Sequence, residues 1–236
     1  MFKIILAHFR IIFTLVLTLV AMSTSSSLAQ ENRATVKFNL FSIEGLVVGK
    51  NISIDAAYGE KHGVPVSAPF TFLVPNADGV VPLYNTATEP GGMLLKVSFA
   101  TEESVGTENI QLIENLQFVG MTLPMAEPKE RLTTLAKLLA NDAFSASVAG
   151  YAESKYIGTR QTKIGDYIAI EVVGEYIDPQ LGHMYLRIVG IPNPDGPNSI
   201  FTISNIVASR LNLQSIDDLA RTSSGTGLSR FKYITE

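Results

Sequence analysis

Apolar and polar residues alternate along much of the chain after residue 35, and this pattern predicts a protein built largely from strands. In residues 35–43, Val36, Phe38 and Leu40 alternate with polar neighbours, as in a half-buried strand. Turn-forming residues at 75–79 and 89–92 separate further expected strands. These strands are NISIDAAY (51–58), PFTFLV (69–74) and MLLKVSFAT (93–101).

The spacing of leucines changes in residues 127–144 and predicts a helix there. Leu132, Leu135 and Leu139 recur at helical spacing and form an apolar stripe, which is typical of a core-facing side. Pro128 suits the first turn of such a helix. The preceding residues 107–121 have no clear period, and we expect irregular or short helical structure in them.

The second half of the chain returns to strand patterns. Residues 158–177, 182–191 and 199–206 predict an antiparallel meander. A short helix is expected from Ser215, because Ser215 and Asp218 have the spacing of a capping box. Residues 222–236 are expected to form a flexible turn and an edge strand.

This order of elements predicts an α+β fold, in which an antiparallel β-sheet packs against one longer and one short helix. We expect residues 30–236 to form a single α+β domain that follows a cleavable signal peptide at 1–29. The alternative is a small β-rich subdomain at 30–90 followed by a second α+β domain at 91–236. The sequence pattern leaves both divisions open.

The first 29 residues have the features of a secretory signal peptide. Lys3 and Arg10 precede an apolar run of about twelve residues, and Ser27-Leu28-Ala29 fits a cleavage site. The run is shorter than the roughly 20 residues that a membrane-spanning helix needs. We therefore predict a periplasmic or secreted protein, without stable membrane insertion once the signal peptide is removed.

Composition narrows the class of partner. Removing Lys3 and Arg10 from the 18 basic residues leaves 16 against 22 acidic ones, so the mature chain is mildly acidic. Such a chain has no basic field for nucleic acid, and no nucleic-acid partner is expected. Cysteine is absent, which excludes disulfides and thiolate chemistry.

Two glutamates in the meander could suggest acid–base catalysis. Glu171 and Glu175 are four residues apart on a strand, about 13 Å, whereas paired glycosidase carboxylates lie about 5–9.5 Å apart. If the hairpin folds about Gln180, Arg187 lies diagonal to both glutamates. We therefore interpret the three charges as a solvent-facing row and expect no catalytic residue among them.

The remaining candidates are isolated. His62 and His183 are the two histidines of the mature chain, and no zinc-binding spacing surrounds them, so no metal and no cofactor is expected. Residues 192–198 form a polar turn between strands, where loops often carry binding residues. A speculative binding rim therefore consists of His62, His183, Asp195 and Asn198.

Two further motifs indicate structural roles and not phosphate binding or catalysis. Residues 221–230, RTSSGTGLSR, have the look of a phosphate-binding loop, but they follow the expected helix and lack the Gly-Lys-Ser/Thr ending. We expect Gly225 and Gly227 to end the helix and turn the chain. No serine lies in a Gly-x-Ser-x-Gly motif, so a serine triad has little support.

The order of elements resembles a known group. The helix in PKERLTTLAKLLAND, the strands GDYIAIEVVGEYI and GHMYLRIVGI, and the helix SIDDLARTS together resemble the PsbP/DcrB-like exported α+β proteins. The resemblance covers about Leu94 to the C-terminus and matches no motif residue by residue. It implies a non-enzymatic envelope or assembly factor.

Three functions remain open at this stage. The first is a non-enzymatic binding or assembly module whose partner is an unknown protein of the bacterial cell envelope or periplasm. The second is a periplasmic hydrolase whose site is assembled from scattered Asp, Glu, His and Ser residues. The third is a carrier of a small apolar ligand between helix and sheet.

Overall fold

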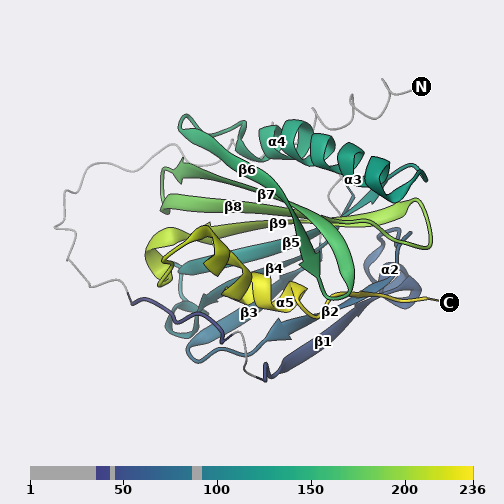
Figure 1. Cartoon of the computed structure of the whole chain (residues 1–236). Helices are drawn as coiled ribbons and strands as arrows, with labels where there is room; N and C mark the ends of the chain where they lie inside the picture. The colour runs from purple at the N-terminus through teal and green to yellow at the C-terminus, as the bar shows by residue number, and fades with distance from the viewer. Residues whose placement is uncertain (1–35, 43–45, 87–91, 236) are drawn as a thin grey trace.

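The computed structural model describes residues 36–42, 46–86 and 92–235 (Figure 1). The expected signal peptide at 1–29 lies outside these residues. Two antiparallel sheets and a few short helices make up the described chain, which confirms the predicted α+β class. Among the described residues, no helix is both long and apolar enough to cross a bilayer.

The larger sheet has seven strands in the order β3-β4-β5-β9-β8-β7-β6. Each pair of neighbours is antiparallel, and β6 to β9 follow one another as a meander. The prediction had three segments in this meander, but a turn at Gly165 and Asp166 divides the expected segment 158–177 between β6 and β7. The strands are β3 (Val80–Asn85), β4 (Met93–Thr101), β5 (Leu112–Thr122), β6 (Ser154–Ile164), β7 (Tyr167–Asp178), β8 (Gly182–Ile191) and β9 (Asn198–Val207).

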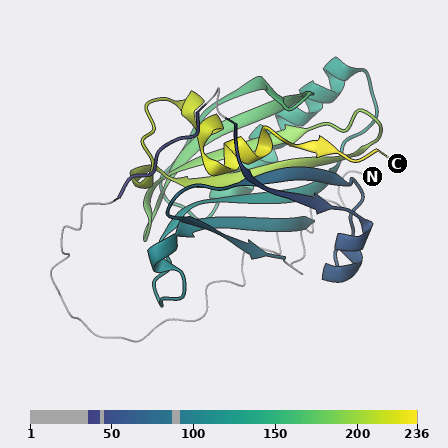
Figure 2. The same cartoon turned by 90° about the horizontal axis from the view of Figure 1, so that it is seen from below.

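A smaller sheet joins the two ends of the described chain. It contains β1 (Gly49–Ile54), β2 (Phe70–Pro75) and the two-residue strand β10 (Lys232–Tyr233), in the order β1-β2-β10. The blue strand β2 and the yellow C-terminal segment therefore lie side by side in both views, with β1 on the far side of β2 (Figures 1 and 2). Phe70 and Phe72 of β2 pack against Phe118 of β5, which places the small sheet over the large one.

Helices cover the opposite face of the large sheet. Residues 128–148 run as α3 (Pro128–Lys137), a π-helical segment (Leu138–Ala143) and α4 (Phe144–Val148), close to the predicted 127–144. Leu135 and Leu139 pack on Gly190 of β8, and Phe144 packs on Gly174 of β7. The predicted leucine stripe therefore does face the core.

The remaining helices are short. They are α2 (Ala56–His62), α5 (Ser223–Leu228) and three 3₁₀ helices (Glu102–Ser104, Ala208–Arg210 and Ile216–Arg221). The predicted capping box at Ser215 and Asp218 is present at the last of these 3₁₀ helices. The helix α5 is buried along its whole length and contacts β2 and β5.

Several local predictions were wrong. The strand expected at 51–58 ends at Ile54, and residues 56–58 begin α2. Residues 112–122 form the interior strand β5, which the irregular polarity of the stretch concealed because two of its polar side chains, Glu114 and Asn115, are buried. Of the expected strand at 35–43, the described part makes only an isolated bridge from Phe38 to Leu211. The segment after Thr222, expected to be a flexible turn, is the buried helix α5.

Gly174 illustrates how closely the helical layer packs. A Cβ added there would lie 2.8 Å from the Lys155 carbonyl oxygen and closer still to the Phe144 ring. A Cβ added at Gly158, on the neighbouring strand, would meet nothing within 4 Å.

We predict that Gly174→Ala lowers the free energy of unfolding by about 1–3 kcal/mol, because the backbone of β6 or the ring of Phe144 must move. Gly158→Ala, the matched control, should stay within about 0.5 kcal/mol of the wild type. Urea denaturation of both variants measures the difference. Equal stability of the two variants would show that the layer relaxes freely.

Candidate functional site

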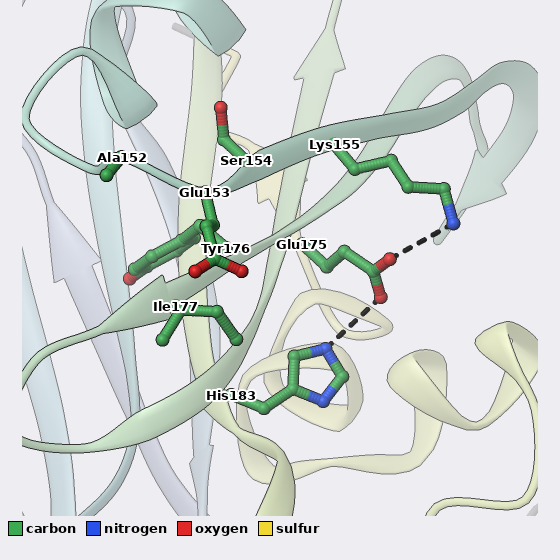
Figure 3. A pocket seen from close by; sticks show the side chains of 8 residues that line it. All are labelled: Ala152, Glu153, Ser154, Lys155, Glu175, Tyr176, Ile177 and His183. Carbon is green, nitrogen blue, oxygen red and sulfur yellow. Dashed lines mark hydrogen bonds and ion pairs between the residues drawn. The ribbon is translucent and has the colours of Figure 1, made fainter.

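A shallow depression of about 600 Å³ lies at one end of the large sheet, where β6 begins, β7 ends and β8 begins (Figure 3). The connection from α4 supplies Glu153 at its edge. The side chains of Tyr176 and Ile177 contribute apolar surface. Three charged or titratable side chains, Lys155, Glu175 and His183, gather on one side of it.

Glu175 is the centre of this group. Its carboxylate accepts a hydrogen bond from Lys155 Nζ at 3.2 Å and lies 3.1 Å from His183 Nε2. The three side chains are 26%, 72% and 41% exposed for Glu175, Lys155 and His183. Partial burial raises the pKa of Glu175, but its contacts with Lys155 and His183 outweigh this and leave that pKa below its usual value.

The register of the meander explains this grouping. Lys155 pairs directly with Glu175 across β6 and β7, and Tyr185 pairs with Glu175 across β7 and β8. His183 is two residues from Tyr185 and so shares its face, diagonal to Glu175. The predicted hairpin register was correct, and it contained the Glu175–His183 contact. Treating His183 as an isolated candidate overlooked this contact.

The other polar groups of the depression do not complete a nucleophilic site. In Figure 3 the Ser154 side chain points away from the His183 ring. The Tyr176 hydroxyl donates to Asn205 Oδ1 at 2.9 Å, under the helical layer. Burial raises the pKa of Tyr176 well above its usual value, so the phenol stays protonated at neutral pH.

Glu171 contradicts the predicted solvent-facing row. Its side chain is 1% exposed and that of Arg187 is 2% exposed, and Arg187 Nε donates to Glu171 Oε1 at 2.5 Å. Arg160 of β6 also donates to Glu171 and, at 2.5 Å, to Asp217 of the Ile216–Arg221 helix. The prediction of exposure was wrong because a second layer covers this face of the sheet.

Opposing effects set the charge state of Glu171. Burial alone would raise the pKa of its carboxyl group, but Arg187 and Arg160 outweigh burial, and the pKa lies below its usual value. Arg187 Nη1 is also buried and has no hydrogen-bond partner in the described part of the chain. Glu171 is therefore the counterion of Arg187 inside the fold.

The stretch that resembles a phosphate loop already holds an anion of the protein itself. The fully buried Glu114 carboxylate accepts hydrogen bonds from the backbone amides of Ser223 at 2.6 Å and Ser224 at 3.0 Å, at the start of α5. A phosphate would have to displace this carboxylate. The stretch is thus structural, as expected, although it begins a helix and does not end one.

The speculative rim residues do not come together. His183 lies at the start of β8, while Asp195 and Asn198 follow the end of that ten-residue strand. They are therefore separated by about 25 Å or more along the sheet. His62 ends α2 and stacks on Tyr58. The rim as a binding surface stays a prediction, with His183 its one member at the depression.

Hydrogen bonds from the side chain of Arg131 anchor the loop that carries Asp195. Arg131 of α3 is 7% exposed, and its guanidinium donates to the carbonyl oxygens of Asn193 and Gly196, each at 2.9 Å.

In the part of the chain that the structure describes, no three His, Asp or Glu side chains cluster as metal ligands would.

Comparison with known proteins identifies no relative by sequence. No protein-family description matches the chain, and no curated protein matches it. Solved structures match only in fold, at 7–11% identity and TM-scores of 0.41–0.44 for the three described below.

The cyanobacterial PsbP (CyanoP) of Synechocystis sp. PCC 6803 matches with a TM-score of 0.43 and 11% identity, over 82% of this chain and 98% of that one. LpqN of Mycobacterium tuberculosis, involved in cell envelope biogenesis, matches with a TM-score of 0.44 and 7% identity, over 79% and 91%. The Saccharomyces cerevisiae Ran-binding protein Mog1p matches with a TM-score of 0.41 and 9% identity, over 78% and 96%.

The predicted resemblance to PsbP-type proteins is therefore confirmed as a weak likeness in architecture. These values are too low for any residue or activity to be transferred from those proteins.

We predict that Glu171→Gln lowers the free energy of unfolding at neutral pH by about 3–5 kcal/mol, because Arg187 then keeps its charge in the core without a counterion. Glu175→Gln, the exposed control on the same strand, should cost less than about 1 kcal/mol. Chemical denaturation measures both variants. If Glu171→Gln does not fold, the double variant Glu171→Leu with Arg187→Met tests the same pair and should recover stability.

The pH dependence has a defined sign. Because the pKa of Glu171 is lowered in the folded state, its contribution is complete above the unfolded value of about 4.3 and is lost as pH falls through the lower folded value. The stability gap between wild type and Glu171→Gln should therefore narrow below about pH 4. A gap that widens towards acid would contradict the assignment.

Proposed function

We propose that this chain is an exported, non-enzymatic binding module for another protein of the bacterial cell envelope, and that the depression beside β6 is part of its binding surface. Export is inferred from the signal-like residues 1–29. We also propose that residues 30–236 act as one domain. The pairing of β2 with β10, near opposite ends of the chain, supports this.

The observation that carries the proposal is the mutual pairing of the charged groups at the depression. The Glu175 carboxylate is held by Lys155 and His183, and none of the three is withdrawn from solvent as catalytic groups usually are. A charged rim beside the exposed, apolar Ile177 suits a protein contact, where polar rims surround apolar centres.

Exposed apolar side chains also bear on the contact surface. Of the twelve large apolar side chains exposed in the described residues, four lie on β6 and β7: Tyr156, Ile157, Ile168 and Ile177. Ile168 and Ile177 lie at opposite ends and on opposite faces of β7, so they do not form one patch, and Ile177 is the member of this set that lines the depression.

We predict that a photo-crosslinking amino acid at Ile177, in cells that produce the protein, yields one discrete adduct in the envelope fraction, identifiable by mass spectrometry. The same probe at Tyr84, an exposed residue on the opposite edge strand, is the matched control and should give no such adduct. Adding Glu175→Lys should lower the yield about fivefold, because the rim charge is reversed.

Two results would count against the binding module. One is the absence of any discrete adduct at Ile177 under several growth conditions. The other is an identical set of adducts at Tyr84, which would indicate general stickiness of the chain.

A hydrolase is the second candidate, and the contact between His183 and Glu175 favours it. A carboxylate beside an imidazole is the arrangement of a general base, and Glu153 lies at the same depression. If this dyad acts on a substrate, His183→Ala should abolish hydrolysis of chromogenic ester and glycoside panels by purified protein. A wild type inactive on all panels, with the adduct at Ile177 present, favours the binding module.

The apolar-ligand carrier finds less support. The contact between the helical layer and the sheet is filled by packed side chains, with Leu135 and Leu139 directly against Gly190. A ligand there would have to displace them.

A further inference from the structure

The two edges of the large sheet differ in how open they are. The edge strand β3 has six residues, two of them exposed, and carries Pro82, which has no backbone N–H to donate. The edge strand β6 has eleven residues, eight of them exposed, and contains no proline. Proteins usually blunt long open edges, because such edges pair with other strands.

The register identifies the free backbone groups of β6. The two-residue turn at Gly165 and Asp166 makes Ile164 and Tyr167 the closing hydrogen-bonded pair. Alternation then directs the N–H and C=O groups of Thr159, Gln161 and Lys163 away from β7. Within the described residues, no backbone hydrogen bond outside the sheet ladder involves them. Three consecutive donor–acceptor positions thus face outward.

The side chains along this edge are of one charge. Between Ser154 and Ile164 the strand carries Lys155, Arg160 and Lys163 and no acidic residue, although the whole chain has a net charge of −4. The acids that pair with Lys155 and Arg160 lie inward, on β7 and on the Ile216–Arg221 helix. Lys163 forms no ion pair with any described residue, and its neighbour on β7 is the exposed Ile168.

This charge pattern decides between occupants. A second copy of the chain, paired edge to edge, would bring two cationic edges together, and like charges on adjacent strands repel. An extended segment with an acidic side chain opposite Lys163 would instead complement the β6 cation that forms no ion pair with a described residue, since Lys155 and Arg160 already have acidic partners. A β-bulge between Tyr156 and Gly158 leaves Ile157 without a partner on β7, and its side chain is 38% exposed.

We propose that β6 takes up an extended segment of the partner protein as an eighth, antiparallel strand. The segment has an acidic residue facing Lys163 and, six positions further on, an apolar residue facing Ile157. Main-chain hydrogen bonds to Thr159, Gln161 and Lys163 hold it. This inference rests on the proposed binding function and extends its surface, because Ser154 and Lys155 belong both to β6 and to the depression.

The test uses synthetic eleven-residue peptides, labelled with a fluorophore, and the mature protein. One peptide carries a glutamate at the position that faces Lys163 and an isoleucine at the position that faces Ile157. A second peptide has a lysine in place of the glutamate. Fluorescence anisotropy should show binding of the acidic peptide and at least about tenfold weaker binding of the basic one.

Two variants separate charge from backbone pairing. Lys163→Glu should weaken binding of the acidic peptide by about fivefold to tenfold and strengthen binding of the basic peptide. Gln161→Pro removes an outward N–H without removing a bond to β7, and it should abolish binding of both. Lys129→Glu, the same charge change on an exposed residue of α3, is the control and should change neither. A thermal melt of each variant checks folding, and Lys163→Glu keeps the test decisive if Gln161→Pro unfolds.

The outcomes are distinct from those of the proposed function. If Ile177 gives an adduct but neither peptide binds, the proposed binding function is supported and the addition of a strand to β6 is overturned. Binding that Lys163→Glu and Lys129→Glu change equally would also overturn it, since this indicates general attraction. If neither peptide binds and β6 variants aggregate, the cations of β6 only keep the edge from self-pairing.

Discussion

Covering the large sheet on both faces is the constraint on which the rest of the structure depends. Seven strands with apolar side chains on both sides need two layers, and the chain supplies them from separate regions. Residues 128–148 cover one face. The other is covered by a sheet that brings together β2 and the C-terminal β10. Tyr233 fastens this layer, because its hydroxyl donates to the Ile191 carbonyl at 2.5 Å and accepts from Ile200 N at 2.9 Å.

Because both faces of the large sheet are covered, several charged groups are buried and must find partners within the protein. A side chain beneath the second layer cannot reach water, so an ionised one needs a partner inside. Glu114 finds the first amides of α5, and Glu171 finds Arg187 and Arg160. These paired charges hold the layers in register. Because Glu114 and Glu171 are bound to groups of the protein itself, they have little scope to act on a substrate.

What the two layers leave uncovered is the strand β6 and the depression at its beginning. There Lys155, Glu175 and His183 are paired but solvated, and the outward side of β6 carries unused backbone groups. The same meander therefore provides buried ion pairs at its centre and an open edge at its end. This is why we propose a binding surface at that edge, which includes His183 but not the distant His62, Asp195 and Asn198.

The sequence alone determined the properties that depend on neighbours along the chain. Helical spacing of Leu135 and Leu139 predicted α3, alternation predicted most strands, and the turn at Gln180 fixed the register that pairs Glu175 with Tyr185. Only the tertiary structure decided what covers each face. Alternation identifies two sides of a strand but says nothing of a layer formed by residues about 40 or more positions away, such as the one over Glu171. Burial is a long-range property, and it separates the buried Glu171 from the accessible Glu175 on one strand.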